Sequence, residues 1–201
     1  VIITLTHNGL VKRTNVSSYR AQRRGGKGVI GMGTRKESVV QGEAEDFIEH
    51  LFTASTHDYL MFFTNTGRVY VRRVHEIPDM GRSAKGRNIA NLLELQSGEK
   101  IAALIRVESH LGSDKENLTW QQEQFLLFAT ESGTVKKTAL GAYANVRRTG
   151  INAIGINEGD RLITVKLTTG HDEVVLITSD GKSIRFNEEN VRSMGRTAAG
   201  V

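Results

Sequence analysis

The sequence contains no cysteine and no long apolar run, and both absences restrict what the chain can be. Without cysteine the chain forms no disulfide and has no thiol chemistry. No stretch of 18 apolar residues occurs, so we expect no membrane-spanning helix and no membrane partner. A secretory signal pattern is also missing before the first strand-like residues, VIITLT, which favours a cytoplasmic protein. Because that strand is already under way at Val1, and the last residues lie inside a repeated unit, we expect both ends to be cuts through a larger protein.

Motifs for catalysis and for metal binding are missing as well. The six histidines include no close pair with metal-ligand spacing. No nucleophile elbow and no phosphate-binding P-loop is present. The carboxylates lie in acidic stretches that indicate solvated surface, namely Glu43, Glu45 and Asp46, then Asp172 and Glu173. We therefore expect no catalytic residue, no metal site and no cofactor in this chain.

The main internal signal is a fourfold repeat. Four segments align on one glycine, and each has a threonine three residues earlier: Gly9, Gly67, Gly133 and Gly181, with Thr6, Thr64, Thr130 and Thr178. Each segment predicts a strand, a tight turn and a second strand. The dipeptides Asn8-Gly9 and Asp180-Gly181 favour type I′ turns, in which both central residues have positive φ. Ser132-Gly133 and Thr66-Gly67 are weaker examples of the same pattern.

A second glycine and further apolar runs recur around these hairpins. In the first, second and fourth repeats the second glycine lies 19 residues after the anchor glycine, at Gly28, Gly86 and Gly200. In the third repeat it lies 17 residues after the anchor, at Gly150. The apolar runs HLFTAS, KIAALIRV and RLITVKL each predict one more strand upstream of a hairpin. Polar insertions account for the variable spacing of the repeats. The insertion at 41–49 is compatible with a short helix, and the one at 114–124 indicates a surface loop.

Units of about four short strands, with anchor glycines 48 to 66 residues apart, are typical of propeller-like folds. A row of ordinary hairpins in a sandwich or a barrel would also explain the turns. It would give no reason for the threonine and both glycines to recur in register. We therefore predict an all-β fold, a propeller-like disc of four-stranded blades, with residues 1–201 forming one domain fragment of four blades.

The positive charge is concentrated at one place in every repeat. The 21 residues that start at each anchor glycine together hold 20 of the 27 lysines and arginines, but 4 of the 22 acidic residues. These windows carry a net charge of +16, and the rest of the chain carries −11. Single charge runs are usually solvated faces. Solubility gives no reason for the same segregation in four repeats, which predicts a continuous basic surface for a continuous polyanion.

Duplex DNA is the polyanion that this pattern favours. Lysine and arginine neutralise its phosphates, and glycine lets backbone N–H groups approach phosphate oxygens. Zinc-finger spacing, a helix-turn-helix and a basic region with heptads are absent, so sequence-specific reading is not expected. The aromatic residues Phe62, Phe63, Phe125 and Phe128 lie in apolar strands that predict core, not stacking platforms for single strands. We expect sequence-tolerant contacts to the DNA backbone.

The segment Gln22-Arg23-Arg24-Gly25-Gly26-Lys27-Gly28 resembles the GyrA box, the signature of the C-terminal domains of bacterial DNA gyrase A subunits. All seven residues match, and the segment follows the first predicted hairpin, as it does in that family. TNTGRVY, ATESGTVKKT and VRSMGRTAAGV are similar to later blades of the same domain. The resemblance thus runs along the whole chain.

What the resemblance implies is a β-pinwheel, a disc whose blades exchange a strand with their neighbours and whose rim wraps duplex DNA with positive handedness. The box is the key determinant of wrapping in the family, and residues 22–28 take that role here. Implied partners are the rest of the gyrase A protein and the gyrase B protein, in a heterotetramer that introduces negative supercoils. Its ATP, its Mg and its DNA-cleaving tyrosine lie outside this chain. The family domain has six blades, whereas four anchors are present here.

The predicted DNA-binding residues follow from the box and from the basic windows. Arg23, Arg24 and Lys27 lead, and the first repeat supports them with Lys12, Arg13 and Arg20. The later repeats continue the path with Arg82, Lys85, Arg87, Lys136, Lys137, Arg147, Arg148, Arg192 and Arg196. Two alternatives stay open: the C-terminal domain of topoisomerase IV, whose box is degenerate or absent, and a propeller that binds an acidic protein. An independent enzyme has no supporting constellation.

Overall fold

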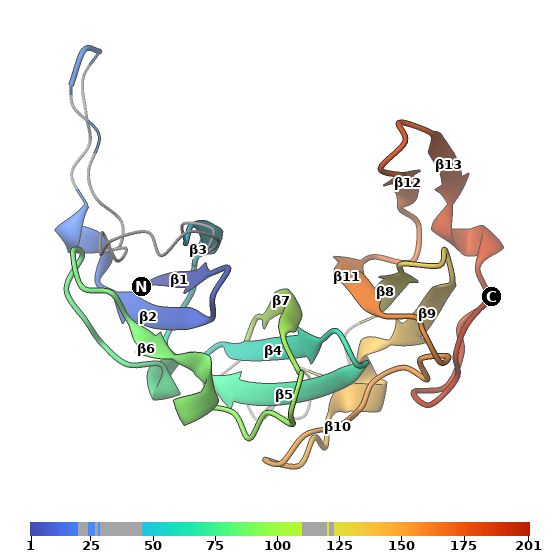
Figure 1. Ribbon diagram of the computed structural model, residues 1–201, viewed down its shortest axis with the longest axis horizontal. Coiled ribbons are helices and arrows are strands. Elements are labelled where there is room, and N and C mark those ends of the chain that lie inside the picture. The colour runs from blue at the N-terminus through green and yellow to red at the C-terminus, as the bar shows by residue number, and fades with distance from the viewer. Residues whose placement is uncertain (20–23, 27, 29–45, 110–119, 121–122) are drawn as a thin grey trace. The chain divides into compact units, whose positions relative to one another are not determined.

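The chain forms short antiparallel strands (Figure 1), and the computed structural model describes residues 1–19, 24–26, 28, 46–109, 120 and 123–201. The strands are β1 Ile2–Thr6, β2 Leu10–Thr14, β3 Ile48–Thr53, β4 Tyr59–Thr64, β5 Arg68–Arg73, β6 Arg87–Asn88, β7 Ile101–Val107, β8 Phe125–Thr130, β9 Val135–Ala139, β10 Ile151–Asn152, β11 Leu162–Thr168, β12 Glu173–Ile177 and β13 Ser183–Asn187. Short 3₁₀ helices lie at Val16–Ser18, Val74–Glu76, Ile89–Asn91, Leu140–Tyr143 and Glu188–Asn190. The all-β prediction is confirmed. Over the described residues, no helix is long and apolar enough to cross a membrane.

The chain divides into two compact units. The first holds residues 1–60 and 72–96, and the second holds residues 61–71 and 97–201. The hairpin of β4 and β5 therefore contributes to both units. That residues 1–201 form a single domain stays a prediction. Of the predicted helix at 41–49, residues 41–45 lie outside the described residues, and Ile48 already begins β3. Most of the predicted loop at 114–124 also lies outside them.

The four predicted hairpins are present, and the repeated threonine has the same contact in each. Its hydroxyl oxygen accepts a hydrogen bond from the backbone N–H four residues later, at 3.0 to 3.2 Å. The anchor glycine N–H donates to the carbonyl of the same threonine, at 3.1 Å in the first hairpin. The threonine therefore closes the turn with both its side chain and its backbone.

The predicted type I′ turn is wrong. Gly9 has φ +85°, but Asn8 does not, since every residue with positive φ in the described part of the chain is a glycine. β1 ends at Thr6 and β2 begins at Leu10, which leaves a three-residue connection. Such loops combine a turn of ordinary φ with one left-handed residue. The Asn-Gly dipeptide favoured the two-residue turn, but the threonine hydroxyl fixes the longer one.

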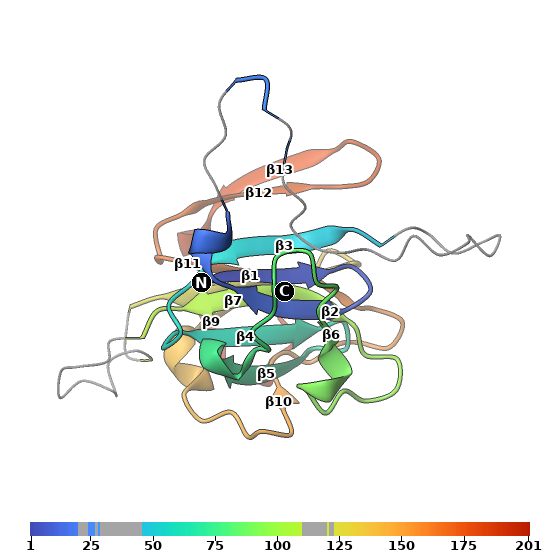
Figure 2. The ribbon, with the colours of Figure 1, turned by 90° about the vertical axis from the view of Figure 1, so that its left-hand side faces the viewer.

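Each of the first three hairpins takes its outer strands from the following repeat. β3 pairs with β1 and β6 pairs with β2, which gives the order β3-β1-β2-β6 (Figures 1 and 2). The next sheet has the corresponding order β10-β5-β4-β7, and the third has β11-β8-β9. Val201 completes the third sheet, because its backbone exchanges hydrogen bonds of 2.7 and 2.9 Å with Val135. β12 and β13 form a sheet of two strands in the described residues.

Large side chains from the hairpins fill the interior. Phe62, Phe63 and Phe128 are fully buried, which confirms their predicted place in the core, and Phe125 is half-buried. In the second unit the ring of Phe63 meets Phe128 edge-on, with 5.5 Å between centroids, and meets Tyr143 at 6.4 Å. Edge-to-face pairs at such distances are favourable. The loops of the repeats are therefore attached to hairpins that are themselves packed in the core.

Candidate nucleic-acid interface

Three loops carry seven of the predicted DNA-binding residues: the second loop (78–88), the third loop (145–152) and the fourth loop (192–201), each named after its repeat. They connect a hairpin to the outer strand that pairs with the preceding hairpin. The corresponding first loop contains the box.

The second loop is attached to β2 at both ends. At its start, Arg13 N–H donates to the Pro78 carbonyl (2.8 Å), and Met80 N–H donates back to Arg13 (2.9 Å). At its end, Asn88 of β6 is paired with Leu10 of β2. Contacts along one strand thus fix both ends of the loop.

The middle of the second loop is held from inside by a lysine. Lys12 is fully buried, and its Nζ donates to the carbonyls of Gly81 (3.1 Å), Ala84 (3.0 Å) and Arg82. Burial lowers the pKa of this ammonium from its ordinary value of 10.5. The three carbonyl dipoles point toward the charge and take the place of water.

The fourth loop repeats this arrangement in the second unit. Met194 N–H donates to the Lys137 carbonyl (2.8 Å), and Val201 pairs with Val135. Lys136 is fully buried, and its Nζ donates to the carbonyls of Ala153 (2.8 Å) and Arg196. Burial, and then the charge of Arg196, lower the pKa of Lys136 to about 8. Arg82 and Arg196 occupy the same place in their repeats, 15 residues after the anchor glycine.

The third loop is held by an arginine. Arg68 Nη2 donates to the Thr149 carbonyl at 2.8 Å, and β10 pairs with β5 at Ile151 and Val69. At the position of the two buried lysines this hairpin has Tyr70, whose hydroxyl donates to Glu99 Oε1 at 3.0 Å. In this repeat the second glycine follows the anchor glycine two residues sooner than in the other repeats, and a different cation supports the loop.

Three predicted DNA contacts do not fit the structure. Lys12, Lys136 and Lys137 are buried, with exposed fractions of 0, 0 and 6%, and their ammonium groups point into the protein. A buried ammonium cannot reach a phosphate without leaving its acceptors. The sequence prediction took these three lysines of the basic windows as exposed. On these central strands, however, both faces are covered, and a charged side chain can point inward.

The remaining predicted residues of these loops are at the surface. Arg13, Arg82 and Arg196 are half-buried, while Lys85, Arg87, Arg147, Arg148 and Arg192 are exposed. Arg13 Nε donates to the Ile77 carbonyl (3.1 Å), and Arg82 Nη1 donates to the Ser18 carbonyl (3.3 Å). Exposed cations therefore occur in the corresponding loop of three successive repeats.

The box is described in part. Arg24, Gly25, Gly26 and Gly28 are exposed, and Gly25 has φ +80°, a backbone conformation that suits glycine. The other predicted residues of this region, Arg20, Gln22, Arg23 and Lys27, lie outside the described residues.

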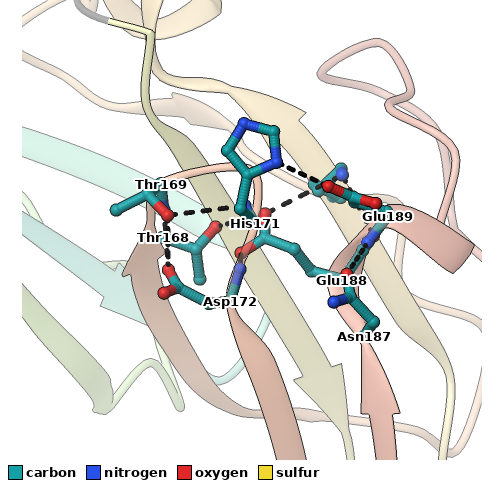
Figure 3. A network of polar contacts seen from close by, with 8 residues as sticks. Thr168, Thr169, His171, Asp172, Asn187, Glu188 and Glu189 are labelled. Atoms are coloured by element: carbon teal, nitrogen blue, oxygen red, sulfur yellow. Dashed lines mark hydrogen bonds and ion pairs between the residues drawn. The ribbon is translucent and has the colours of Figure 1, made fainter.

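Lys137 contacts a polar network around Glu188 that the sequence did not reveal. Figure 3 shows Glu188 with Thr168 and Asp172. The Nζ of Lys137 donates to the Glu188 carbonyl (3.0 Å) and lies 3.8 Å from Oε1 of the same residue. Glu188 is fully buried, and its carboxylate accepts from the Thr168 hydroxyl (2.9 Å) and from Asp172 N–H (3.0 Å). A buried carboxylate needs such partners. No pattern in the sequence marks Glu188 as different from the exposed Glu189 beside it.

Histidine and carboxylate side chains also meet at the surface near this network. His171 Nδ1 lies 2.5 Å from Glu189 Oε1, and this carboxylate raises the pKa of the imidazole (Figure 3). Asp172 accepts from Thr169 N–H at 2.8 Å and so closes a turn. Within the described ranges, no group of three or more histidine and carboxylate side chains could hold a metal ion.

These features define a class: an all-β repeat protein with basic loops at equivalent places of successive repeats. The model of the family "DNA gyrase C-terminal domain, beta-propeller" matches residues 1–42, 58–108, 124–169 and 172–201, and the chain belongs to that family. Similar curated proteins are the DNA gyrase A subunits of Clostridium acetobutylicum, 42% identical, and Halalkalibacterium halodurans, 45% identical. Each match covers 100% of this chain, which spans 22% of the length of these relatives.

Two solved structures share the fold. The C-terminal domain of a DNA topoisomerase IV superposes with a TM-score of 0.73 at 29% identity, over 100% of this chain and 55% of that one. A DNA gyrase A C-terminal domain gives a TM-score of 0.65 at 23% identity, over 100% of this chain and 58% of that one. These likenesses support the predicted propeller-like class.

Proposed function

We propose that this chain binds duplex DNA through the phosphate backbone and bends it around its basic loops. The observation that carries the proposal is the recurrence of exposed cations, such as Lys85, Arg147 and Arg192, in the corresponding loops of three successive repeats. Loops fixed to the preceding hairpin present them, so the cations need little ordering on binding. Lysine and arginine that neutralise phosphates release counterions, which drives association without reading the sequence.

In the longer protein the bound DNA would be wrapped, and the wrap would serve negative supercoiling by a DNA gyrase. Membership in the gyrase family and the complete box at residues 22–28 support this step. The partners would then be the remainder of the gyrase A protein and the gyrase B protein, in the bacterial cytoplasm. Catalysis, ATP and Mg would belong to those other parts.

The test is end-to-end FRET on a labelled duplex of about 150 base pairs, roughly one persistence length. The full chain is compared with a box variant, Arg23→Ala, Arg24→Ala and Lys27→Ala. A charge-matched control carries Lys100→Ala, Arg106→Ala and Lys166→Ala, all outside the basic windows. We expect strong bending by the parent and by the control, and weak bending by the box variant. Equal losses in both variants would mean that net charge, and not a wrapped path, holds the DNA.

A topoisomerase IV domain is the second candidate, favoured by the 29% identity and the TM-score of 0.73. The box variant separates the two, because a domain that does not depend on the box would bend DNA equally well without it. The third candidate is binding of an acidic protein. Affinity measured against duplex length addresses it: a wrapped path gains contacts on longer DNA, whereas a local basic patch does not.

A further inference from the structure

Three successive hairpins hold the loop of the next repeat with a cation on its carbonyl oxygens. Lys12 reaches the second loop, Arg68 the third and Lys136 the fourth. Lys12 and Lys136 occupy the same position of their repeats, whereas in the second hairpin an arginine two residues earlier makes the contact. Repetition of one contact by different residues indicates that the contact itself matters.

The Lys12 contact has the geometry needed to fix a loop's shape. An ammonium has three donors, and here they go to three carbonyls of the segment 81–84. One hydrogen bond would leave the loop free to rotate about it, whereas three bonds from one atom set the relative positions of Gly81, Arg82 and Ala84. Among the described residues no carboxylate pairs with Lys12, so its acceptors are the loop carbonyls. The exposed cations of this loop, Lys85 and Arg87, come next in the sequence after Ala84.

We propose that Lys12 and Lys136 are positioning residues for DNA binding, which hold the basic loop of the following repeat in the shape that presents its cations to phosphates. The proposal rests on the proposed function. Neither lysine contacts DNA, and each acts from the repeat before the loop it serves. Each repeat thereby prepares the DNA-binding surface of its neighbour.

A double-mutant cycle tests Lys12. Lys12→Met keeps the length and the apolar body of the side chain but removes its donors. Lys85→Ala with Arg87→Ala removes the exposed cations of the same loop. We expect Lys12→Met to weaken binding of a 150-base-pair duplex on the order of tenfold at 0.15 M salt, comparable with losing one or two phosphate contacts. In the Lys85→Ala, Arg87→Ala background, Lys12→Met should have no further effect, because the loop has nothing left to position.

The other outcomes are distinguishable. If Lys12→Met binds the duplex like the parent while the Lys85→Ala, Arg87→Ala variant binds weakly, the positioning role is overturned. The proposed function is then unaffected. Equal weakening in both backgrounds shows that Lys12 acts through net charge or overall stability, which also overturns it. A loop variant that binds like the parent removes this loop from the DNA path, and both proposals fail for this loop. Val11→Ala, a core truncation on the same strand, controls for stability, since Val11 is fully buried and carries no charge.

Lys136 provides a second, independent test. Lys136→Met is combined with Arg192→Ala in the same cycle, which keeps the proposal testable if Lys12→Met does not fold. The pH profile adds a readout that a purely structural role would not move. Around the Lys136 ammonium lie Arg196, the ring of Phe128 at 5.2 Å and the Tyr143 hydroxyl, which shares the Ala153 carbonyl. We expect DNA affinity to fall as pH rises through about 8 in the parent, but not in Lys136→Met. The same fall in both proteins would overturn the inference.

Discussion

Two kinds of position in this chain restrict which residue can occupy them. One holds a buried charge, and the other holds a glycine where no side chain fits. Lys136 shows the first, since its ammonium is buried against carbonyl oxygens and an aromatic ring. Burying an ammonium is costly, and the cost appears as its lowered pKa. Gly67 shows the second, because a Cβ there would lie 2.7 Å from the Ile154 carbonyl oxygen. Both constraints give predictions that can be measured.

Stability should rise with pH because of Lys136. Its pKa is about 8 in the folded chain and near the ordinary 10.5 when unfolded, so between these values the unfolded chain binds more protons. The free energy of unfolding therefore increases as pH rises from about 8 to 10.5, by about 3 kcal/mol. Urea denaturation at pH 7 to 10 measures it. Lys136→Met should flatten the rise, and Lys100→Met, at an exposed lysine, should not. Stability that increases while DNA affinity falls would exclude unfolding as the cause of weaker binding.

Gly67→Ala and Gly98→Ala form a matched pair in the second unit. Both glycines have positive φ, +85° and +80°, so alanine is strained at either position. At Gly98 no atom lies within 4 Å of the added Cβ, and we expect a loss of about 1 kcal/mol. At Gly67 the close carbonyl adds a steric cost, and the total should exceed about 3 kcal/mol. Chemical denaturation of both variants checks this, and equal losses would show that the backbone around Ile154 yields.

At the scale of the element, the hairpin with its threonine is the unit that recurs. Thr64→Val removes the acceptor of the Arg68 N–H, and Thr64 itself is fully buried. We expect a loss of about 1 to 2 kcal/mol, because the Thr64 side chain is fully buried and the freed N–H loses its partner in a part-buried contact. Thr178→Val removes the same contact in the exposed fourth hairpin, where water can replace it, and should cost less. The difference between the two variants in thermal or chemical unfolding is the measurement, and a larger loss at Thr178 would contradict it.

The hairpins and the upstream outer strands β3, β7 and β11 could be predicted because their signals are local. Threonine, glycine and alternating apolar runs lie within about ten residues of one another. The pairing of Leu10 with Asn88 could not be derived in this way, since no local pattern says which hairpin an outer strand joins. The burial of Lys12 was missed for a related reason. A charge in a strand predicts exposure unless the acceptors that satisfy it are known, and these lie 69 to 72 residues away.

For the whole molecule, the proposed function predicts a steep salt dependence. About six phosphate contacts would give a slope near −5 for log affinity against log salt concentration. Lys85→Ala with Arg87→Ala should reduce its magnitude by about 2, one for each lost contact. Fluorescence anisotropy between 50 and 200 mM salt measures both slopes. Lys100→Ala with Lys166→Ala, outside the basic windows, should change the slope little. A parent slope near zero would remove the model of phosphate contacts.

The exchange of outer strands has a consequence for the order in which the chain is made. β3 covers one edge of the hairpin β1–β2, and β6 covers the other. β6 is complete only when the ribosome has added Asn88. Every hairpin of this kind obtains its outer strands only after the following repeat has been synthesised. Until then its unpaired strand edges can pair with other chains. During synthesis the sheet of one repeat can therefore be completed only after the next repeat has been translated. A nascent chain that pauses between repeats would expose one unfinished sheet at a time, always the most recent.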